Sequence, residues 1–406
     1  MRCSLVWSSL LFAFSCGSGG TKPAPQTNAP QTNAPAARPA PAPPVPPALL
    51  AQQKHGGELY ARICAVCHGA KGEGYKADRA SALAHPEFLA SATDFFLRVS
   101  IARGRPGTVM SAWSSDHGGP LSVSDVDAIV AFMRTWQTQP RASLDERPRG
   151  GDAKRAEPVY ARECAQCHGA RGVRGPNIQI GDPGLLASVS NGFLRHAIRK
   201  GRAGTPMLAF GDKLGDQGVE DMVALIRSFG EPPAGQGATA APHDHAHHDH
   251  GHDHHHHHHE PPKLTAPLPL GKVVLNPRGR EPVGFEVYPK MTSAKVIHDQ
   301  LVAGARMAFL DARPPSDYVR KHIAGAVSVP YYDPSPYLDK LPKDTWLVSY
   351  CFCPTAESGE LAKKLLEHGF KKVTVLAEGL GYWEAQGWKT KGTEKKAQND
   401  TPHAPH

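Results

Sequence analysis

One five-residue pattern occurs twice in this chain of 406 residues and constrains its fold more than any other feature. The first copy is Cys64-Ala-Val-Cys67-His68, and the second, one hundred residues later, is Cys164-Ala-Gln-Cys167-His168. Each copy follows Tyr-Ala-Arg and one variable residue, and each precedes Gly-Ala. Identity on both sides of the motif indicates a duplicated structural unit.

The residue types and their spacing point to covalent haem attachment. Two cysteines separated by two residues can form thioethers to the vinyl groups of haem, and the histidine that follows faces the iron. A CxxC pair alone is also typical of a dithiol redox couple or half of a zinc site. The histidine after both copies favours haem, and hence electron transfer. The predicted sites for two haem c groups are the thioether cysteines Cys64, Cys67, Cys164 and Cys167 and the iron ligands His68 and His168.

A second iron ligand is expected after each motif. The matching segments 104–110 and 201–207 each contain glycine and proline and end on methionine. A single methionine usually fills a core, but methionine at the same place in both units predicts Met110 and Met207 as axial ligands. Ligation by histidine and methionine raises the haem potential. The alternative ligands are His85, His117 and His196.

Each unit closes with apolar residues at helical spacing. The positions are Val126, Ile129, Val130 and Met133 in the first unit, and Val219, Met222, Val223 and Ile226 in the second. Ser124 and Asp125 supply capping residue types before the first of these helices.

Together with a helix that ends at CxxCH, a middle helix at 93–103 and the methionine loop, these features resemble the class I cytochrome c fold. The resemblance covers residues 52–138 and 152–231. It implies two all-α domains in which the last helix packs across the first, with an exposed haem edge.

The N-terminus predicts an export signal. Arg2 precedes an apolar run at 5–14, and Cys16 follows Phe-Ser and precedes Gly17. Residues 1–16 resemble a bacterial lipoprotein signal, which implies Cys16 as a lipid anchor and a periplasmic location; an ordinary cleaved signal peptide is the alternative. Gly17 favours the outer membrane by analogy with lipoprotein sorting. No other segment is long and apolar enough for a transmembrane helix.

Two segments have biased compositions. Residues 17–50 hold 10 of the 38 prolines and repeat Gln-Thr-Asn-Ala-Pro, which predicts a disordered linker. A second linker is predicted at 232–282, where residues 243–259 contain 12 of the 23 histidines. Such a tract can bind zinc, nickel or copper, although a solvated linker without a metal role is equally consistent with it. The candidate ligands are His243, His245, His247, His248, His250, His252 and His254.

From residue 283 short apolar strands alternate with helices, which predicts an α/β domain with a parallel sheet at 283–392 and a disordered tail at 393–406. Particular residues in this part resemble a single rhodanese domain. They are Asp311-Ala-Arg313, Tyr318, His322-Ile-Ala-Gly325-Ala326, Tyr350-Cys351 and Gly379-Leu-Gly-Tyr-Trp383. The whole chain is therefore predicted to be multidomain, with two all-α cytochrome c domains followed by this α/β domain.

The resemblance implies that Cys351 is the catalytic cysteine, in a loop whose backbone N–H groups bind an anion. The loop departs from the usual Cys-x-x-Gly-x-Arg pattern, because it is one residue longer and Pro354 removes an N–H donor. Glu357 stands where an anion-binding arginine is expected, and a carboxylate there would repel thiosulfate.

Four roles of Cys351 and Cys353 remain open. Cys351 could form a persulfide that Cys353 resolves. The pair could instead be a dithiol couple that exchanges electrons with the haems, or it could bind Cu(I). In the fourth case the domain only binds proteins and the cysteines are inert.

The net charge of +8 is spread thinly along the chain. Arg195, Arg199, Lys200 and Arg202 gather before Met207 and could steer an acidic partner. We expect a redox donor and a redox acceptor as partners and find no nucleic-acid motif. The sequence leaves the oligomeric state open.

Overall fold

The structure is a computed structural model. It describes residues 45–394 except 78, 106–108, 172–174, 176, 231–266 and 353–355. The first repeat contains α1 (Pro47–Ile63), α2 (Ala65–His68), α3 (Pro86–Ser91), α4 (Asp94–Arg103), η1 (Ser115–His117), α5 (Val123–Met133) and η2 (Arg134–Trp136). The second contains α6 (Ala153–Glu163), α7 (Ala165–His168), α8 (Pro183–Ser188), α9 (Asn191–Lys200) and α10 (Gly211–Ser228).

In both repeats the last long helix packs across the first, α5 on α1 and α10 on α6. The crossing of α1 and α5 is close because Gly56 has no side chain: a Cβ placed there would lie 1.9 Å from the carbonyl oxygen of Ala128. The buried faces carry the apolar residues that the helical spacing predicts, among them Val126, Ile129 and Val223. The predicted packing of two all-α units is therefore confirmed.

One expected helix start and one expected linker boundary differ from the structure. Ser122, not Ser124, caps α5; its side chain accepts from the N–H of Asp125, whose carboxylate accepts from the N–H of Ser122. This reciprocal capping box satisfies two N–H groups that the helix leaves without partners. At the other end of the repeat, α1 already begins at Pro47, inside the expected linker 17–50, because proline is well tolerated in the first helical turn.

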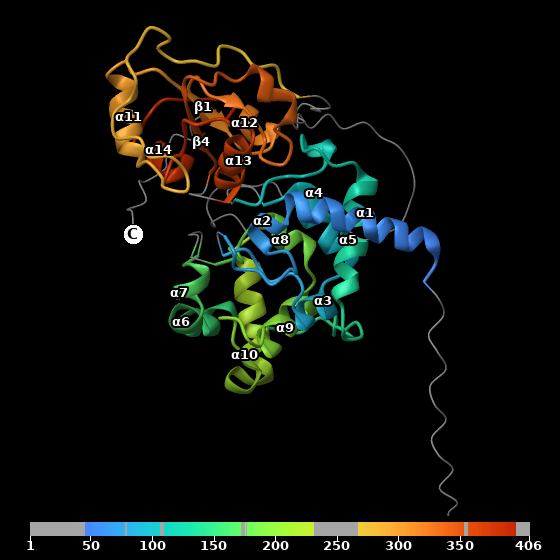
Figure 1. The fold of residues 1–406 in the computed structure, drawn as a ribbon. Helices are drawn as coiled ribbons and strands as arrows, with labels where there is room; N and C mark the ends of the chain where they lie inside the picture. The colour runs from blue at the N-terminus through green and yellow to red at the C-terminus, as the bar shows by residue number, and fades with distance from the viewer. Residues whose placement is uncertain are drawn as a thin grey trace, which may run out of the picture. The chain divides into compact units, whose positions relative to one another are not determined.

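The C-terminal domain has a four-stranded parallel sheet in the order β3-β1-β4-β5. Its elements are α11 (Ala294–Val302), β1 (Met307–Asp311), α12 (Pro315–Arg320), β2 (His322–Ile323), β3 (Val327–Ser328), η3 (Ser335–Lys340), β4 (Trp346–Tyr350), α13 (Ala356–Glu367), β5 (Val373–Val375), α14 (Gly379–Ala385) and β6 (Thr390–Lys391). Helices cover both faces of the sheet (Figure 1). The predicted α/β architecture is confirmed.

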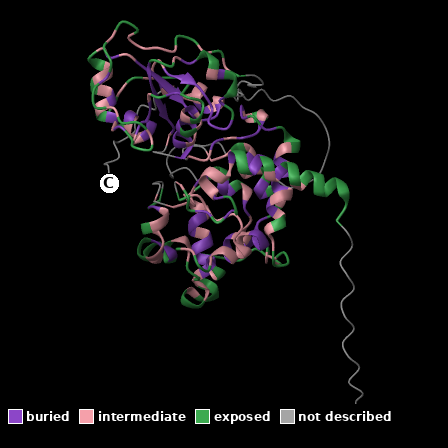
Figure 2. Cartoon of the chain, viewed as in Figure 1, coloured by how far each residue is buried: buried purple, intermediate pink, exposed green. Residues whose placement is uncertain are grey.

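Successive side chains of each strand point to opposite faces of the sheet, so the core of this domain consists of two clusters, one on each face. Met307 and Phe309 of β1 pack in one apolar cluster with α11 and α14, whereas Ala308 and Leu310 pack in another that includes α13. Because both faces are covered, β1 and β4 are buried along their whole length (Figure 2).

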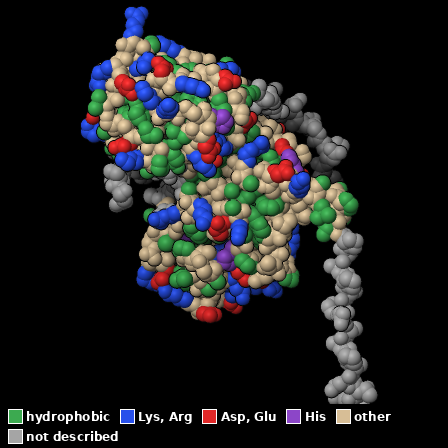
Figure 3. Space-filling model, in the orientation of Figure 1, with side chains coloured by type: hydrophobic (Ala, Val, Ile, Leu, Met, Phe, Trp, Pro, Cys, Tyr) green, Lys and Arg blue, Asp and Glu red, His purple; other side chains and the backbone are tan. Residues whose placement is uncertain are grey.

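The surface mixes charges of both signs. On the face shown in Figure 3, acidic and basic side chains are interspersed rather than separated into fields of one sign. Among the described residues, no helix is long and apolar enough to cross a membrane.

Candidate haem sites and cysteine site

The two CxxCH motifs occupy equivalent places in the repeats. Cys64 follows the last residue of α1, and the rest of the motif forms the one-turn helix α2. Cys164 stands in the same position between α6 and α7. In both copies the short helix places the two cysteines and the histidine of one motif within little more than one helical turn, as attachment to a single haem requires.

The histidines of both motifs are oriented by backbone hydrogen bonds. His68 Nδ1 lies 2.9 Å from the carbonyl oxygen of Ser81, and His168 Nδ1 lies 2.8 Å from that of Ile178. Each bond fixes the ring and leaves Nε2 for a metal, the usual second contact of an iron-binding histidine. Burial lowers the pKa of both imidazoles and keeps them in the neutral, metal-binding form. This arrangement fits a haem iron ligand in each repeat.

A tyrosine in each repeat holds the segment after the motif. The hydroxyl of Tyr60 donates to the carbonyl oxygen of Gly69 over 2.9 Å, and Tyr160 donates to Gly169 over 2.8 Å. Both glycines have positive φ angles, near 80°, which non-glycine residues rarely adopt. The tyrosine of the repeated Tyr-Ala-Arg thus has the same structural role in both repeats.

The two methionine loops share one turn. The N–H of Arg105 donates to the carbonyl oxygen of Met110 over 2.8 Å, and the N–H of Arg202 donates to that of Met207 over 2.7 Å. Both methionines are half-buried. The loops therefore have equivalent geometry, as expected for two residues with the same role.

Two of the alternative histidine ligands have other partners. His85 caps α3 by accepting from the N–H of Glu87, and its Nε2 lies 2.9 Å from the carbonyl oxygen of Ala203. His196 Nε2 lies 2.9 Å from a carboxylate oxygen of Glu87. These contacts assign both rings to the contact between the repeats. His117 ends η1.

The repeats pack on each other with approximate two-fold symmetry. Helix α3 contacts α9, and the equivalent α8 contacts α4. Phe96 of α4 and Phe193 of α9 are equivalent residues, and their ring centroids lie 5.3 Å apart. A residue that meets its own counterpart lies close to the symmetry axis.

Both methionine loops take part in this contact. The guanidinium of Arg202 lies 5.7 Å from the ring centroid of Phe88 in the first repeat. In the reverse direction, Arg105 interacts electrostatically with Asp182 of the second repeat. The loops that carry the predicted methionine ligands therefore approach each other's domain on both sides of the axis.

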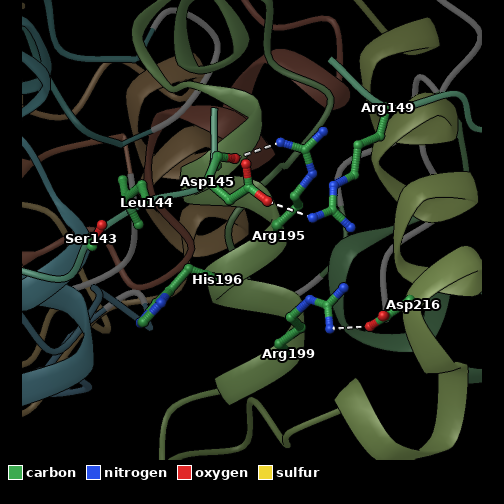
Figure 4. Close-up of a pocket in the computed structure, with 9 residues that line it drawn as sticks. Ser143, Leu144, Asp145, Arg149, Arg195, His196, Arg199 and Asp216 are labelled. Atoms are coloured by element: carbon green, nitrogen blue, oxygen red, sulfur yellow. Dashed lines mark hydrogen bonds and ion pairs between the residues drawn. The ribbon is translucent and has the colours of Figure 1, made fainter. Parts of the chain in front are cut away.

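The arginines before Met207 do not form the open basic patch that the sequence suggested. Arg195 is buried and donates to Glu220 over 2.8 Å, and Arg199 pairs with Asp216 over 2.6 Å. Figure 4 shows Arg195 and Arg199 beside Arg149 and Asp145 around a cavity of about 250 Å³. Charge pairing within the domain thus neutralises two of the four basic residues of this cluster.

Cys351 lies directly after β4 and is fully buried. Its sulfur lies 3.5 Å from the hydroxyl oxygen of Ser358 in the first turn of α13. Beneath it, Arg313 donates to both carboxylate oxygens of Asp311 over 2.9 and 2.6 Å, and Tyr350 donates to Asp311 over 2.9 Å. The cysteine thus sits at the carboxyl end of a central parallel strand, the usual place of a binding site in an open α/β sheet.

The role expected for Glu357 needs correction. Its side chain is buried in the first turn of α13, and burial raises its pKa well above the ordinary value, with further increases from Cys351 and Asp317. The raised pKa favours the protonated, neutral carboxyl, which repels an anion less than a carboxylate does. Burial is a tertiary property and was not visible in the motif.

Several predicted sites lie outside the described residues. They are Cys16, the histidines of the tract at 243–259, Cys353 and Pro354. Among the residues that are described, no cluster of three or more histidine, cysteine or acidic side chains could hold a metal ion.

Sequence reasoning missed four residues at these sites. Ser81 and Ile178 orient the motif histidines through their carbonyl oxygens, which any residue type could supply. Ser111 and Tyr331 contact residues 206 and 268 positions away, and such distances leave no local pattern.

Comparisons with known proteins agree with this architecture. The family model "Cytochrome C oxidase, cbb3-type, subunit III" matches residues 51–133 and 151–226, and the rhodanese-like domain model matches 293–386. The cbb3-type cytochrome c oxidase subunit CcoP of Azospirillum sp. (strain B510) is 27% identical over 201 residues, 45% of this chain and 64% of the relative. The chain thus spans somewhat less than two thirds of that curated relative.

The C-terminal domain has its own relatives. The thiosulfate sulfurtransferase GlpE of Coxiella burnetii (strain RSA 331) is 30% identical over 86 residues, 21% of this chain and 79% of the relative. The solution structure of a rhodanese-like domain from Anabaena sp. is 29% identical with a TM-score of 0.24, covering 29% of this chain and 91% of that structure.

The fold and the repeated motif define a haem electron-transfer protein with an added α/β domain. Specifically, the two helical repeats are cytochrome c domains that match the cbb3-type subunit III model, and the C-terminal domain belongs to the rhodanese-like family. The cytochrome domains imply covalently bound haem c.

Proposed function

We propose that this chain transfers single electrons through two haem c groups, from one redox protein to another. The observation that carries the proposal is the paired orientation of His68 and His168, whose Nδ1 atoms are bonded to backbone while Nε2 is left for iron. The predicted thioether residues are Cys64 and Cys67 in the first repeat and Cys164 and Cys167 in the second. The haem supplies a one-electron couple, and the chain supplies attachment, ligand orientation and burial.

Met110 and Met207 are the proposed second ligands. Replacing either by alanine should leave haem attached through the cysteines, but change its absorption spectrum and lower the potential of that haem, because a thioether ligand favours ferrous iron. Met222→Leu is the matched control, since Met222 is buried in the core of the second repeat and should leave spectrum and potential unchanged. An unaltered spectrum in Met207→Ala would remove Met207 as a ligand.

The contact between the repeats supports electron exchange between the two haems. Phe96 and Phe193 meet at its centre, and the loops before Met110 and Met207 reach the opposite repeat. A short, packed path favours rapid exchange. Reductive titration with a slow mediator, followed by stopped-flow mixing, should therefore show both haems equilibrating faster than either exchanges with the mediator.

Location and metal binding are further parts of the proposal. We propose that the protein lies in the periplasm, anchored to the outer membrane by lipid on Cys16, on the resemblance of residues 1–16 to a lipoprotein signal. Labelling cells with an alkyne fatty acid tests the anchor: wild type should be labelled and Cys16→Ser should not. The tract at 243–259 is proposed to bind divalent transition metals.

A second candidate function is oxidation of reduced sulfur at Cys351. Joining hydrosulfide to the Cys351 thiolate forms an S–S bond, releases one proton and two electrons, and leaves a persulfide. The two electrons would go one each to two ferric haems, so the number of haems matches the chemistry. The observation that favours this function is the packing of α13, which follows the Cys351 loop, against the CxxCH helix α2.

Anaerobic addition of hydrosulfide to the oxidised protein tests the second function. Haem reduction should be rapid in wild type and slow in Cys351→Ser. Both proteins keep the two CxxCH motifs, 64–68 and 164–168, unchanged. Equal rates in the two proteins would mean that sulfide reduces the haems directly and that Cys351 takes no part. A protein that still exchanges electrons with small mediators would then remain a plain electron carrier.

A further inference from the structure

The C-terminal domain contacts the first repeat beside the Cys351 site. The hydroxyl of Ser111, next to Met110, donates to a carboxylate oxygen of Asp317 over 2.5 Å. The hydroxyl of Tyr331 donates to the carbonyl oxygen of Ile63 over 2.5 Å, one residue before the first thioether cysteine. Ser111, Asp317 and Tyr331 are each at most 8% exposed.

Aromatic packing extends the same contact. The ring of Trp113 lies edge-on to those of Tyr331 and Tyr332, with centroid separations of 6.5 and 5.6 Å. Trp113 is 6% exposed and Tyr331 is 1% exposed. Edge-to-face aromatic pairs each contribute about 0.5–1.5 kcal/mol beyond the area that they bury. Residues 109–113, which we call the Met110 segment, are thus held against the rhodanese-like domain by a hydrogen bond and an aromatic cluster.

Very little space remains between the Met110 segment and the Cys351 site. The cavity there has a volume of about 10 Å³ and is lined by Val109 and Ser111 on one side and by Asp317, Phe352 and Glu357 on the other. Such a volume holds about one water molecule. Two arginines also line it, but Arg313 and Arg320 already pair with Asp311 and Asp317. Among the described residues that line this cavity, a sulfur-containing anion finds neither room nor an unpaired cation.

We propose that the Met110 segment is a lid on the Cys351 site, so that the first cytochrome domain controls access of a sulfur donor to this cysteine. The closed form is held by Ser111, Asp317 and the aromatic cluster, and the donor enters when these contacts part. The coupling to haem rests on the proposed ligation by Met110: a lid that carries an iron ligand links the state of the first haem to occupancy at Cys351, in both directions. The contact of the Met110 segment with Phe352 and Glu357, on either side of the Cys351 loop, does not depend on that ligation.

The lid is tested by the reactivity of Cys351 in the full-length haem protein. Ser111→Asp places a second carboxylate against Asp317 and should open the contact, whereas Ser111→Asn has nearly the same shape without the charge. Under anaerobic conditions with reduced thiols, iodoacetamide labelling of the peptide that contains Cys351 is followed by mass spectrometry. We expect labelling at least about tenfold faster in Ser111→Asp than in wild type, equivalent to about 1.4 kcal/mol of lost closure.

The matched variants decide the cause. Ser111→Asn should react within about twofold of wild type, and adding Asp317→Asn to Ser111→Asp should restore slow labelling, because the repulsion is removed. Equal labelling rates in wild type and Ser111→Asp would overturn the lid. The absorption spectrum of Met110→Ala tests ligation separately. An unchanged spectrum would mean that Met110 is not an iron ligand, and the labelling rates alone would then decide whether the Met110 segment is a lid.

Discussion

The buried carboxyl of Glu357 makes the stability of the rhodanese-like domain depend on pH. Burial, Cys351 and Asp317 raise its folded pKa well above the ordinary value of 4.5. Between the unfolded and the folded pKa, the native state holds a proton that the unfolded state has lost. Stability therefore falls as pH rises through this window, with a slope of at most about 1.4 kcal/mol per pH unit.

Glu357→Gln removes this dependence because the amide does not titrate and resembles the protonated acid in shape. As pH rises above the ordinary glutamate pKa of 4.5, we expect the free energy of unfolding of wild type to fall relative to that of Glu357→Gln, by no more than about 1.4 kcal/mol per pH unit. Urea unfolding followed by the fluorescence of Trp346, Trp383 and Trp388, which all lie in this domain, gives the free energy at each pH.

Glu360→Gln is the matched control. Glu360 lies on the same helix but is partly exposed and pairs with Lys364 over 3.7 Å, so its replacement should change stability by less than about 1 kcal/mol and keep the wild-type slope. Parallel pH profiles for wild type and Glu357→Gln would refute the reasoning, because they would mean that Glu357 is ionised in the folded domain.

Three further predictions concern the helical repeats and the histidine tract. Gly56→Ala should destabilise the first repeat by about 1–3 kcal/mol in thermal unfolding, because its Cβ would lie 1.9 Å from the backbone oxygen of Ala128; Gly150→Ala, whose Cβ meets nothing within 4 Å, is the control. Arg195→Met should destabilise the second repeat in denaturant unfolding, because buried Glu220 loses its 2.8 Å partner and keeps only Arg149 at 4.0 Å. The loss should be smaller than the roughly 3–5 kcal/mol of a fully unpaired buried charge, and the double variant with Glu220→Leu should regain most of it. A double variant no more stable than the single one would contradict this. Deleting residues 243–259 should abolish Zn²⁺ binding in calorimetry, while both haem potentials should stay within about 10 mV of wild type. For a one-electron couple about 59 mV corresponds to about 1.4 kcal/mol, so a shift of this size is energetically small. Unchanged Zn²⁺ binding would mean that the zinc site lies elsewhere in the chain.

The sequence alone determined much of the architecture. The repeated CxxCH motif, the apolar spacing around Val126 and Val219, and the strand pattern that ends at Tyr350 each reflect contacts between near neighbours in the chain. Helical period, strand alternation and covalent attachment by adjacent residues are local requirements. They can therefore be read before the chain is folded.

Only the tertiary structure decided the properties that depend on distant residues. The ionisation of Glu357 follows from burial beneath other elements, and the charge of Arg195 is cancelled by Glu220, 25 residues away. The Ser111 contact to Asp317 joins residues 206 positions apart. Burial and long-range pairing are set by how the elements pack, because desolvation and Coulomb energy depend on distance in space and not on separation along the chain.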